Sequence, residues 1–119
     1  MVRSALLLFA FTVIAFAAAA PASAADGAQL FQLMCQTCHQ ANSTPMGPSL
    51  VGVAGRKIAS APGFTYSPAL KIKGGVWTDQ ALDTFLTAPG KFAPGTKMPA
   101  AVAAPGDRSA IIAYLKTQK

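Results

Sequence analysis

The sequence predicts a small all-α domain in which short helices are joined by long, irregular loops. Apolar residues recur at three- and four-residue spacing in several short segments, as they do on one face of a helix. No segment alternates apolar and polar residues with a period of two over the length of a strand. Glycine, proline, serine and alanine dominate residues 40–66, and four prolines punctuate residues 89–105, so both stretches are expected to be loops. A chain of this length suits one domain.

The first 24 residues are predicted to be a cleavable secretory signal peptide, which leaves residues 25–119 as the single domain. Arg3 gives a positive start, residues 5–20 form an uncharged apolar run, and residues 21–24 offer a small-residue cleavage site. Cleavage after Ala25 fits the same pattern. The alternative is an uncleaved anchor, but a membrane-spanning helix needs about 20 apolar residues. We therefore expect an exported protein with no stable membrane anchor after cleavage.

The first helix of the domain is expected over residues 26–38, where Asp26 can act as the N-cap. Three apolar residues share one of its faces: Leu30, Phe31 and Met34. The next stretch, residues 40–66, is unusually long for a loop in a compact domain. Such a loop is typical of a chain that wraps a cofactor.

Three further helices are expected. One begins at Ser67-Pro68, with proline at its first position, and runs to about Lys73. Another begins at Thr78-Asp79 and is ended by Pro89. The last runs from Asp107 to about Gln118. The apolar residues predicted to face the core from these last two helices are Leu82, Phe85, Leu86, Ile111, Ile112, Tyr114 and Leu115.

The segment Cys35-Gln36-Thr37-Cys38-His39 contains the only two cysteines and the only histidine of the chain. Two thiols on one helical turn, followed by an imidazole, form the attachment pattern of c-type haem. Both cysteines would add to the porphyrin vinyl groups, and His39 would ligate the iron. A thioredoxin-like disulfide would need a βαβ setting, which the sequence lacks. A structural zinc site would need four ligands, more than one protomer supplies. A chance match to so short a pattern is the remaining alternative.

Several segments, in the same order, resemble those of class I c-type cytochromes, both the mitochondrial type and its bacterial periplasmic relatives. The segments are residues 35–39 (CQTCH), 47–57 (GPSLVGVAGRK), 61–71 (APGFTYSPALK), 94–98 (PGTKM) and 112–116 (IAYLK). The resemblance covers nearly all of residues 26–117. It implies the class I cytochrome c fold, with crossing N- and C-terminal helices and long loops around one covalent haem c.

The resemblance also assigns the two axial ligands of the haem iron. Met98 would bind opposite His39, and such a His/Met pair raises the reduction potential. Met46 and Met34 are rival ligands because both lie near the haem motif in the sequence. The carbonyl of Pro48 would accept the proton on the other nitrogen of His39 and so fix the imidazole tautomer.

Four more residues match positions around the haem propionates. Arg56, Tyr66 and Trp77 would surround the buried propionate, because a buried carboxylate needs donors or a cation to stay ionised. Thr96 would donate its hydroxyl to the other propionate. Without the resemblance, Trp77 would be taken as core and Arg56 as a surface residue. The residues matching the crossing of the terminal helices are Gly27, Phe31, Ile111 and Tyr114.

The sequence departs from the mitochondrial type in the haem pocket and on the surface. Phe85 and Leu70 replace a tyrosine and an asparagine, which predicts a drier pocket. Three positions that carry lysine in the mitochondrial type are occupied by Gln29, Met34 and Gly90. Lys91 and Lys97 remain. Because lysines around the haem edge steer such proteins to acidic partners, we expect weaker electrostatic steering.

We therefore expect a soluble periplasmic one-electron carrier, monomeric and not an enzyme. The expected partners are redox proteins: a quinol–cytochrome c reductase, a terminal oxidase, a photosynthetic reaction centre or a periplasmic dehydrogenase. No nucleic-acid partner is expected for such a carrier. A haem enzyme or gas sensor would need an open iron position and distal acid–base groups, yet the chain has no second histidine and no glutamate. A dedicated haem subunit of one oxidoreductase stays open, because the lysines are depleted.

Overall fold

The structure, a computed structural model, describes residues 10, 12–17 and 23–119. Its helices are α1 (Ala24–Met34), α2 (Pro68–Lys73), α3 (Asp79–Thr87), α4 (Pro89–Phe92) and α5 (Pro105–Leu115). Within the described residues, extended backbone pairs only at two isolated bridges, so the all-α prediction is confirmed. Most of the predicted signal peptide lies outside the described residues. Among those that are described, no helix has the length and apolar character to cross a membrane.

The first helix begins earlier and ends earlier than predicted. In the unprocessed chain Ser23, not Asp26, is the N-cap, and its Oγ accepts a hydrogen bond from the Asp26 backbone N–H over 3.2 Å. Asp26 instead lies in the first turn, where its carboxylate is favourable beside the positive end of the helix dipole. The helix ends at Met34 because the N–H groups of Cys35 and Gln36 both donate to the Phe31 carbonyl. The haem motif therefore occupies a turn that follows α1.

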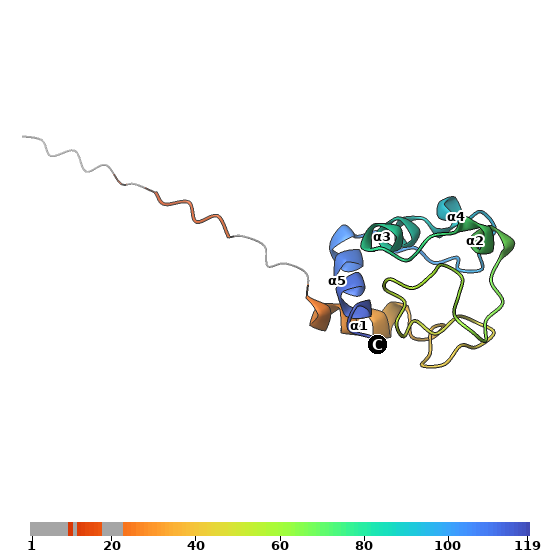
Figure 1. Cartoon of the computed structure of the whole chain (residues 1–119). Helices are drawn as coiled ribbons and strands as arrows, with labels where there is room; N and C mark the ends of the chain where they lie inside the picture. The colour runs from red at the N-terminus through yellow and green to blue at the C-terminus, as the bar shows by residue number, and fades with distance from the viewer. Residues whose placement is uncertain (1–9, 11, 18–22) are drawn as a thin grey trace, which may run out of the picture.

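Helices α1 and α5 cross, as predicted, and Gly27 permits the crossing (Figure 1). A Cβ atom at this position would overlap the backbone carbonyl of Ala110 and lie 2.8 Å from the Cβ of Tyr114. Beside this contact, the rings of Phe31 and Tyr114 pack with centroids 5.3 Å apart. The two backbones can approach this closely only because residue 27 has no side chain.

The helices in the middle of the chain follow their predicted caps. Ser67 Oγ accepts from the N–H of Leu70 at the start of α2, and Thr78 Oγ1 accepts from the N–H of Ala81 at the start of α3. The α3 residues predicted to face inward are buried: Leu82, Phe85 and Leu86. Trp77, in the loop before α3, packs against Phe85 with centroids 5.2 Å apart.

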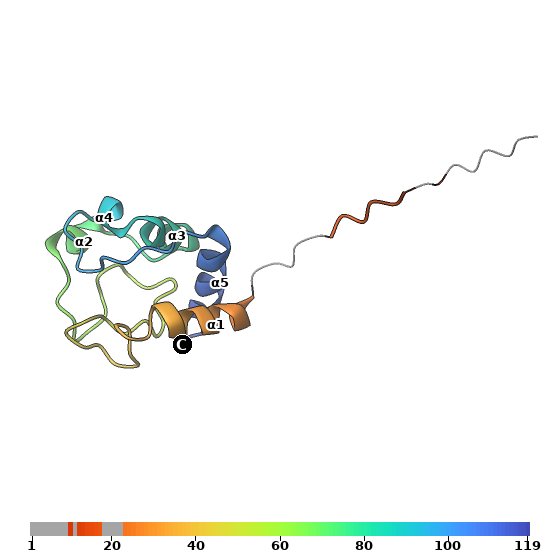
Figure 2. The same ribbon diagram turned by 180° about the vertical axis from the view of Figure 1, so that it is seen from behind.

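Two predictions about the last third of the chain are wrong in detail. Residues 89–105 were expected to be a loop throughout, but Pro89 begins the short helix α4. The proline that ends α3 also suits the first position of a new helix, where no N–H is needed. Helix α5 begins at Pro105 rather than Asp107 for the same reason, and it ends at Leu115. Seen from behind, the part of the long loop that directly follows the haem motif lies on the other side of the molecule from α3 and α4, and the later part runs up to α2 (Figure 2).

Candidate haem site

All nine site residues predicted from the sequence line a single cavity of about 230 Å³. They come from the turn after α1, the two long loops and the segments that flank α2 and α3. They are Cys35, Cys38, His39, Pro48, Arg56, Tyr66, Trp77, Thr96 and Met98. The rest of the wall is mostly apolar. The fold therefore brings together residues that lie as far as 63 positions apart in the sequence.

The turn after α1 fixes the haem motif. The N–H groups of Cys38 and His39 both donate to the Cys35 carbonyl, over 3.1 and 2.9 Å. This geometry places both thiols and the imidazole on the wall of one cavity. Burial raises the pKa of the Cys35 thiol, and the neighbouring Cys38 raises it further. Cys38 is exposed, so the two thiols differ in environment.

His39 is held by the long loop that follows it. Its Nδ1 lies 2.9 Å from the Pro48 carbonyl oxygen, which can only accept, so Nδ1 carries the proton. The lone pair of Nε2 is then left for a metal ion. The turn that places Pro48 is closed by reciprocal backbone hydrogen bonds between Thr44 and Gly47.

Gly47 is a site residue that sequence reasoning missed. A Cβ atom there would lie 2.6 Å from the carbonyl oxygen of Cys38 and 3.2 Å from Nδ1 of His39. The loop can therefore reach the imidazole only if residue 47 is glycine. The available signal was the Gly-Pro pair at 47–48, since a glycine beside a predicted contact residue indicates a close backbone approach.

Three methionines line the cavity, but their environments differ. Met46 is 63% exposed and Met34 is 47% exposed. Met98 is half-buried and packs against the hydrophobic core. A thioether that serves as a ligand within an apolar pocket needs this partial burial, so the environment of Met98 suits a ligand better than those of its rivals.

Arg56 carries a polar group that the protein itself leaves unpaired. Its Nη1 donates to the Val51 carbonyl and its Nη2 to the Ser49 carbonyl, over 3.0 and 3.1 Å. Its Nε is buried and has no hydrogen-bond partner among the described residues. An unpaired buried N–H is costly, and a carboxylate in the cavity would remove this cost.

Tyr66, Trp77 and Thr96 lie on the same cavity wall. The Tyr66 hydroxyl accepts a hydrogen bond from the Ala61 N–H over 3.1 Å, which leaves its own proton for another acceptor. Trp77 is buried between Phe85 and Phe92. Leu70 and Phe85, the two departures from the mitochondrial type, are both buried at the wall. The drier pocket stays a prediction.

These residues fit a covalent haem c. The cavity offers two thiols and an imidazole in one turn, a thioether, apolar walls and one unpaired buried donor. The apolar walls match the porphyrin faces, and the Arg56 guanidinium matches a propionate.

Comparisons with known proteins give the same picture. A family model described as cytochrome c matches residues 24–119. Cytochrome c of Trypanosoma brucei brucei is 48% identical over 81 residues, which are 67% of this chain and 87% of that protein. The solved structure of cytochrome cH from Methylobacterium extorquens is 40% identical, covers 80% of this chain and 98% of its own, and superposes with a TM-score of 0.74. The solved structure of ferricytochrome c2 from Rhodopseudomonas palustris is 37% identical. It covers 82% of this chain and 99% of its own, and it superposes with a TM-score of 0.75.

Proposed function

Because this chain belongs to the cytochrome c family and binds haem c through Cys35 and Cys38, we propose that it is a periplasmic one-electron carrier with His39 and Met98 as axial ligands. Haem c supplies the reversible ferric–ferrous couple when bound. One observation carries the proposal: the imidazole, both thiols and a half-buried thioether line one mostly apolar cavity.

His39 supplies the first axial ligand in a fixed orientation. The 2.9 Å hydrogen bond from Nδ1 to Pro48 holds the tautomer and makes Nε2 a better donor to iron. Met98 would supply the second axial ligand, and its neutral sulfur would favour the ferrous state. If His39 and Met98 fill both positions, no substrate would have a place on the metal, as expected for a carrier rather than an enzyme.

The remaining cavity residues bind the polar edge of the haem. Arg56 offers its unpaired Nε–H to a propionate, and the proton of the Tyr66 hydroxyl is free for the same acceptor. Trp77 and Thr96 would donate further hydrogen bonds to the propionates. Because backbone groups hold Arg56 and Tyr66 in place, little reorganisation is expected to accompany a change in iron charge.

Export, oligomeric state and partners are further parts of this proposal. The predicted signal peptide, residues 1–24, supports export, and a monomer suits a carrier that exchanges partners. Partners of the expected kinds, a quinol–cytochrome c reductase, terminal oxidase, reaction centre or dehydrogenase, would meet it in small, transient contacts. The second candidate is a dedicated haem subunit of one oxidoreductase, favoured by the absence of lysine at residues 29, 34 and 90.

Carbon monoxide binding tests the carrier function. The reduced, haem-loaded protein should keep its visible spectrum in carbon monoxide, because Met98 occupies the position that the gas needs. Rapid and complete binding at neutral pH would instead indicate an open iron and favour a gas sensor or enzyme. Purification from the native periplasm separates the two carrier candidates: a free monomer supports the diffusing carrier, and a stable complex with a catalytic subunit supports the dedicated one.

A further inference from the structure

The segment that follows Met98 has few attachments to the rest of the protein. Residues 99–104 contain no helix and connect Met98 to α5, and all but one of them are exposed. The exception is Val102, which is 4% exposed and whose N–H donates to the Leu86 carbonyl over 2.8 Å. Helix α5 begins without a side-chain cap, because its N-cap is Ala104. Apart from this one backbone hydrogen bond and the buried Val102 side chain, the segment depends on contacts from other side chains to stay in place.

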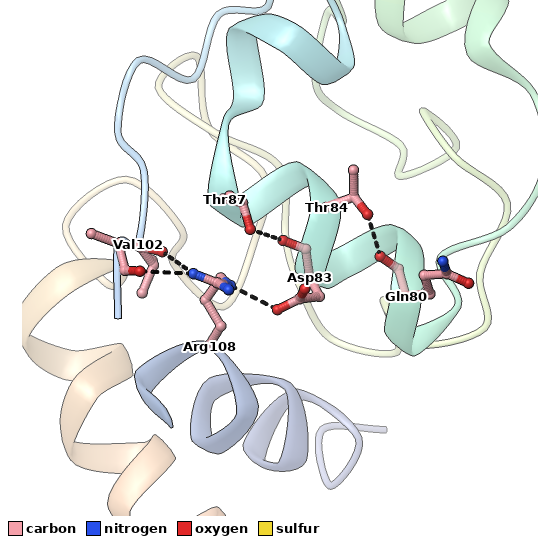
Figure 3. Close-up of polar contacts among 7 residues, drawn as sticks. Gln80, Asp83, Thr84, Thr87, Val102 and Arg108 are labelled. Atoms are coloured by element: carbon pink, nitrogen blue, oxygen red, sulfur yellow. Dashed lines mark hydrogen bonds and ion pairs between the residues drawn. The ribbon is translucent and has the colours of Figure 1, made fainter. Parts of the chain in front are cut away.

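One buried side chain, that of Arg108 in α5, holds the carbonyl groups of this segment (Figure 3). Its Nη1 donates to the carbonyls of Val102 and Ala103, over 3.0 and 2.9 Å. Its Nε donates to Oδ1 of Asp83 on α3 over 2.7 Å. The planar guanidinium can bind a carboxylate and two carbonyls at once, which an ammonium cannot do in this geometry. Arg108 thus ties the segment to α3 and α5 together.

A second ion pair joins the same two helices and provides a comparison. Nζ of Lys116, the C-cap of α5, lies 2.9 Å from Oδ2 of Asp79 on α3, but both side chains are more than half exposed. This pair makes no hydrogen bond to residues 99–104. The Arg108 side chain is only 10% exposed. Both ion pairs connect α3 to α5, but only Arg108 also forms hydrogen bonds to the segment after Met98.

We propose that Arg108 is a positioning residue for Met98, a role that rests on the axial ligation proposed above. Its bonds to the carbonyls of residues 102 and 103 anchor the downstream end of the ligand segment. Upstream, Nζ of Lys97 donates to the Thr65 carbonyl over 2.6 Å, but both residues are exposed. Arg108 is thus the buried side chain that holds the carbonyls of this segment, and its removal raises the fraction of molecules in which the sulfur has left the iron.

Imidazole binding to the oxidised, haem-loaded protein measures this fraction, since imidazole can bind only after Met98 leaves. In Arg108→Leu, imidazole should bind about ten- to hundredfold more tightly, which corresponds to about 1.4 to 2.8 kcal/mol. Arg108→Lys keeps the charge but not the planar fork, so a smaller increase is expected. The matched control, Lys116→Leu, removes the other cation between the same helices and should stay within about twofold of the unaltered protein.

Urea unfolding of each variant separates positioning from general stability. Equal imidazole affinities in Arg108→Leu and Lys116→Leu would overturn the proposal, even if Arg108→Leu unfolded at lower urea. If Arg108→Leu does not mature with haem, a comparison of Asp83→Asn with Asp79→Asn tests the proposal instead. Asp83→Asn should bind imidazole about three- to fivefold more tightly than the unaltered protein, and the imidazole affinity of Asp79→Asn should be unchanged. Equal affinities in that pair would also overturn the proposal. Absence of a methionine–iron band in the unaltered protein would overturn the axial ligation itself, and the proposal with it.

Discussion

At the scale of single residues, side chains of the haem pocket depend on the polarity of their neighbours. Phe85 is packed between Trp77 and Phe92, and neither ring offers a hydrogen-bond acceptor of ordinary strength. Leu70, another wall residue, is equally apolar. A polar atom introduced on Phe85 would therefore have no partner. Phe85 and Leu70 replace a tyrosine and an asparagine of the mitochondrial type. The two replacements belong together, because each one removes a polar group with which the other position could form a hydrogen bond.

The variant Phe85→Tyr tests this pairing. Its hydroxyl would be buried without an acceptor, so the free energy of unfolding should fall by about 1 to 3 kcal/mol. Urea unfolding of the haem-loaded protein measures the loss. Phe92→Tyr is the control, because Phe92 is only half-buried and a hydroxyl there can reach water. Unchanged stability and potential in Phe85→Tyr would show that the pocket already holds an acceptor.

Ala59 is the one non-glycine residue among those described with a positive φ, 57°. L-residues pay roughly 1 kcal/mol or more to adopt this conformation, whereas glycine adopts it freely but loses more entropy on folding. Ala59→Gly should therefore raise the free energy of unfolding by about 0.5 kcal/mol, measured by urea unfolding. A loss of stability would mean that the Ala59 methyl group contributes more by packing than its backbone strain costs.

At the scale of helices, the sequence predicted most of the secondary structure because the caps are local. Ser67 and Thr78 stand directly before their helices and bond to N–H groups three residues on. The errors came where two local signals compete. Pro89 both ends α3 and begins α4, and Ser23 lies within the predicted cleavage site, so its capping role was not considered. The burial of Arg108 could not be predicted, because its partner Asp83 lies 25 residues away.

The close crossing of α1 and α5 predicts that the protein is sensitive to a side chain at residue 27. Gly27→Ala places a methyl group against the backbone of Ala110, which cannot move without shifting α5. The free energy of unfolding should fall by about 2 to 3 kcal/mol. Gly106→Ala is the control: Gly106 is also in one of these helices, but a Cβ there meets nothing within 4 Å. This control should be neutral or stabilising by about 0.5 to 1 kcal/mol.

At the scale of the whole molecule, charge is distributed unevenly. The four acidic residues lie on α1, α3 and α5, and two of them, Asp79 and Asp83, are paired with Lys116 and Arg108. The cations of α2 and α4 are Lys71, Lys73 and Lys91. Beside the haem motif, Gln29 and Met34 are exposed and uncharged. The surface next to the two cysteines is therefore apolar and polar rather than basic.

This distribution predicts a weak salt dependence of electron transfer. Long-range steering is lost when salt shortens the Debye length, but a contact surface with fewer lysines has less steering to lose. The second-order rate constant with a native redox partner should fall by less than about threefold between roughly 0.05 and 0.5 M ionic strength. Gln29→Lys/Met34→Lys should steepen this dependence. A steep fall in the unaltered protein would show that the remaining lysines carry the contact.

The site as a whole was predictable because haem c imposes a fixed set of residue types on the chain. All nine predicted residues line one cavity, although the loops between them form no regular structure. The sequence did not reveal the residues that hold these nine residues in position. Gly47 and Arg108 act through backbone carbonyls; the Gly-Pro pair at 47–48 was a signal for the first contact, but no pattern in the side chains marks the second.

The most direct test of the central claim is the red-edge absorption band of ferric haem with a bound methionine sulfur. It should be recorded at neutral pH for the unaltered, haem-loaded protein, for Met98→Ala and for Met46→Ala. The band should be present in the unaltered protein and in Met46→Ala and lost in Met98→Ala, because Met98 is the half-buried thioether of the cavity. A band that survives Met98→Ala and disappears in Met46→Ala would contradict the assignment of the axial ligand. Its absence from the unaltered protein would contradict the closed-iron carrier altogether.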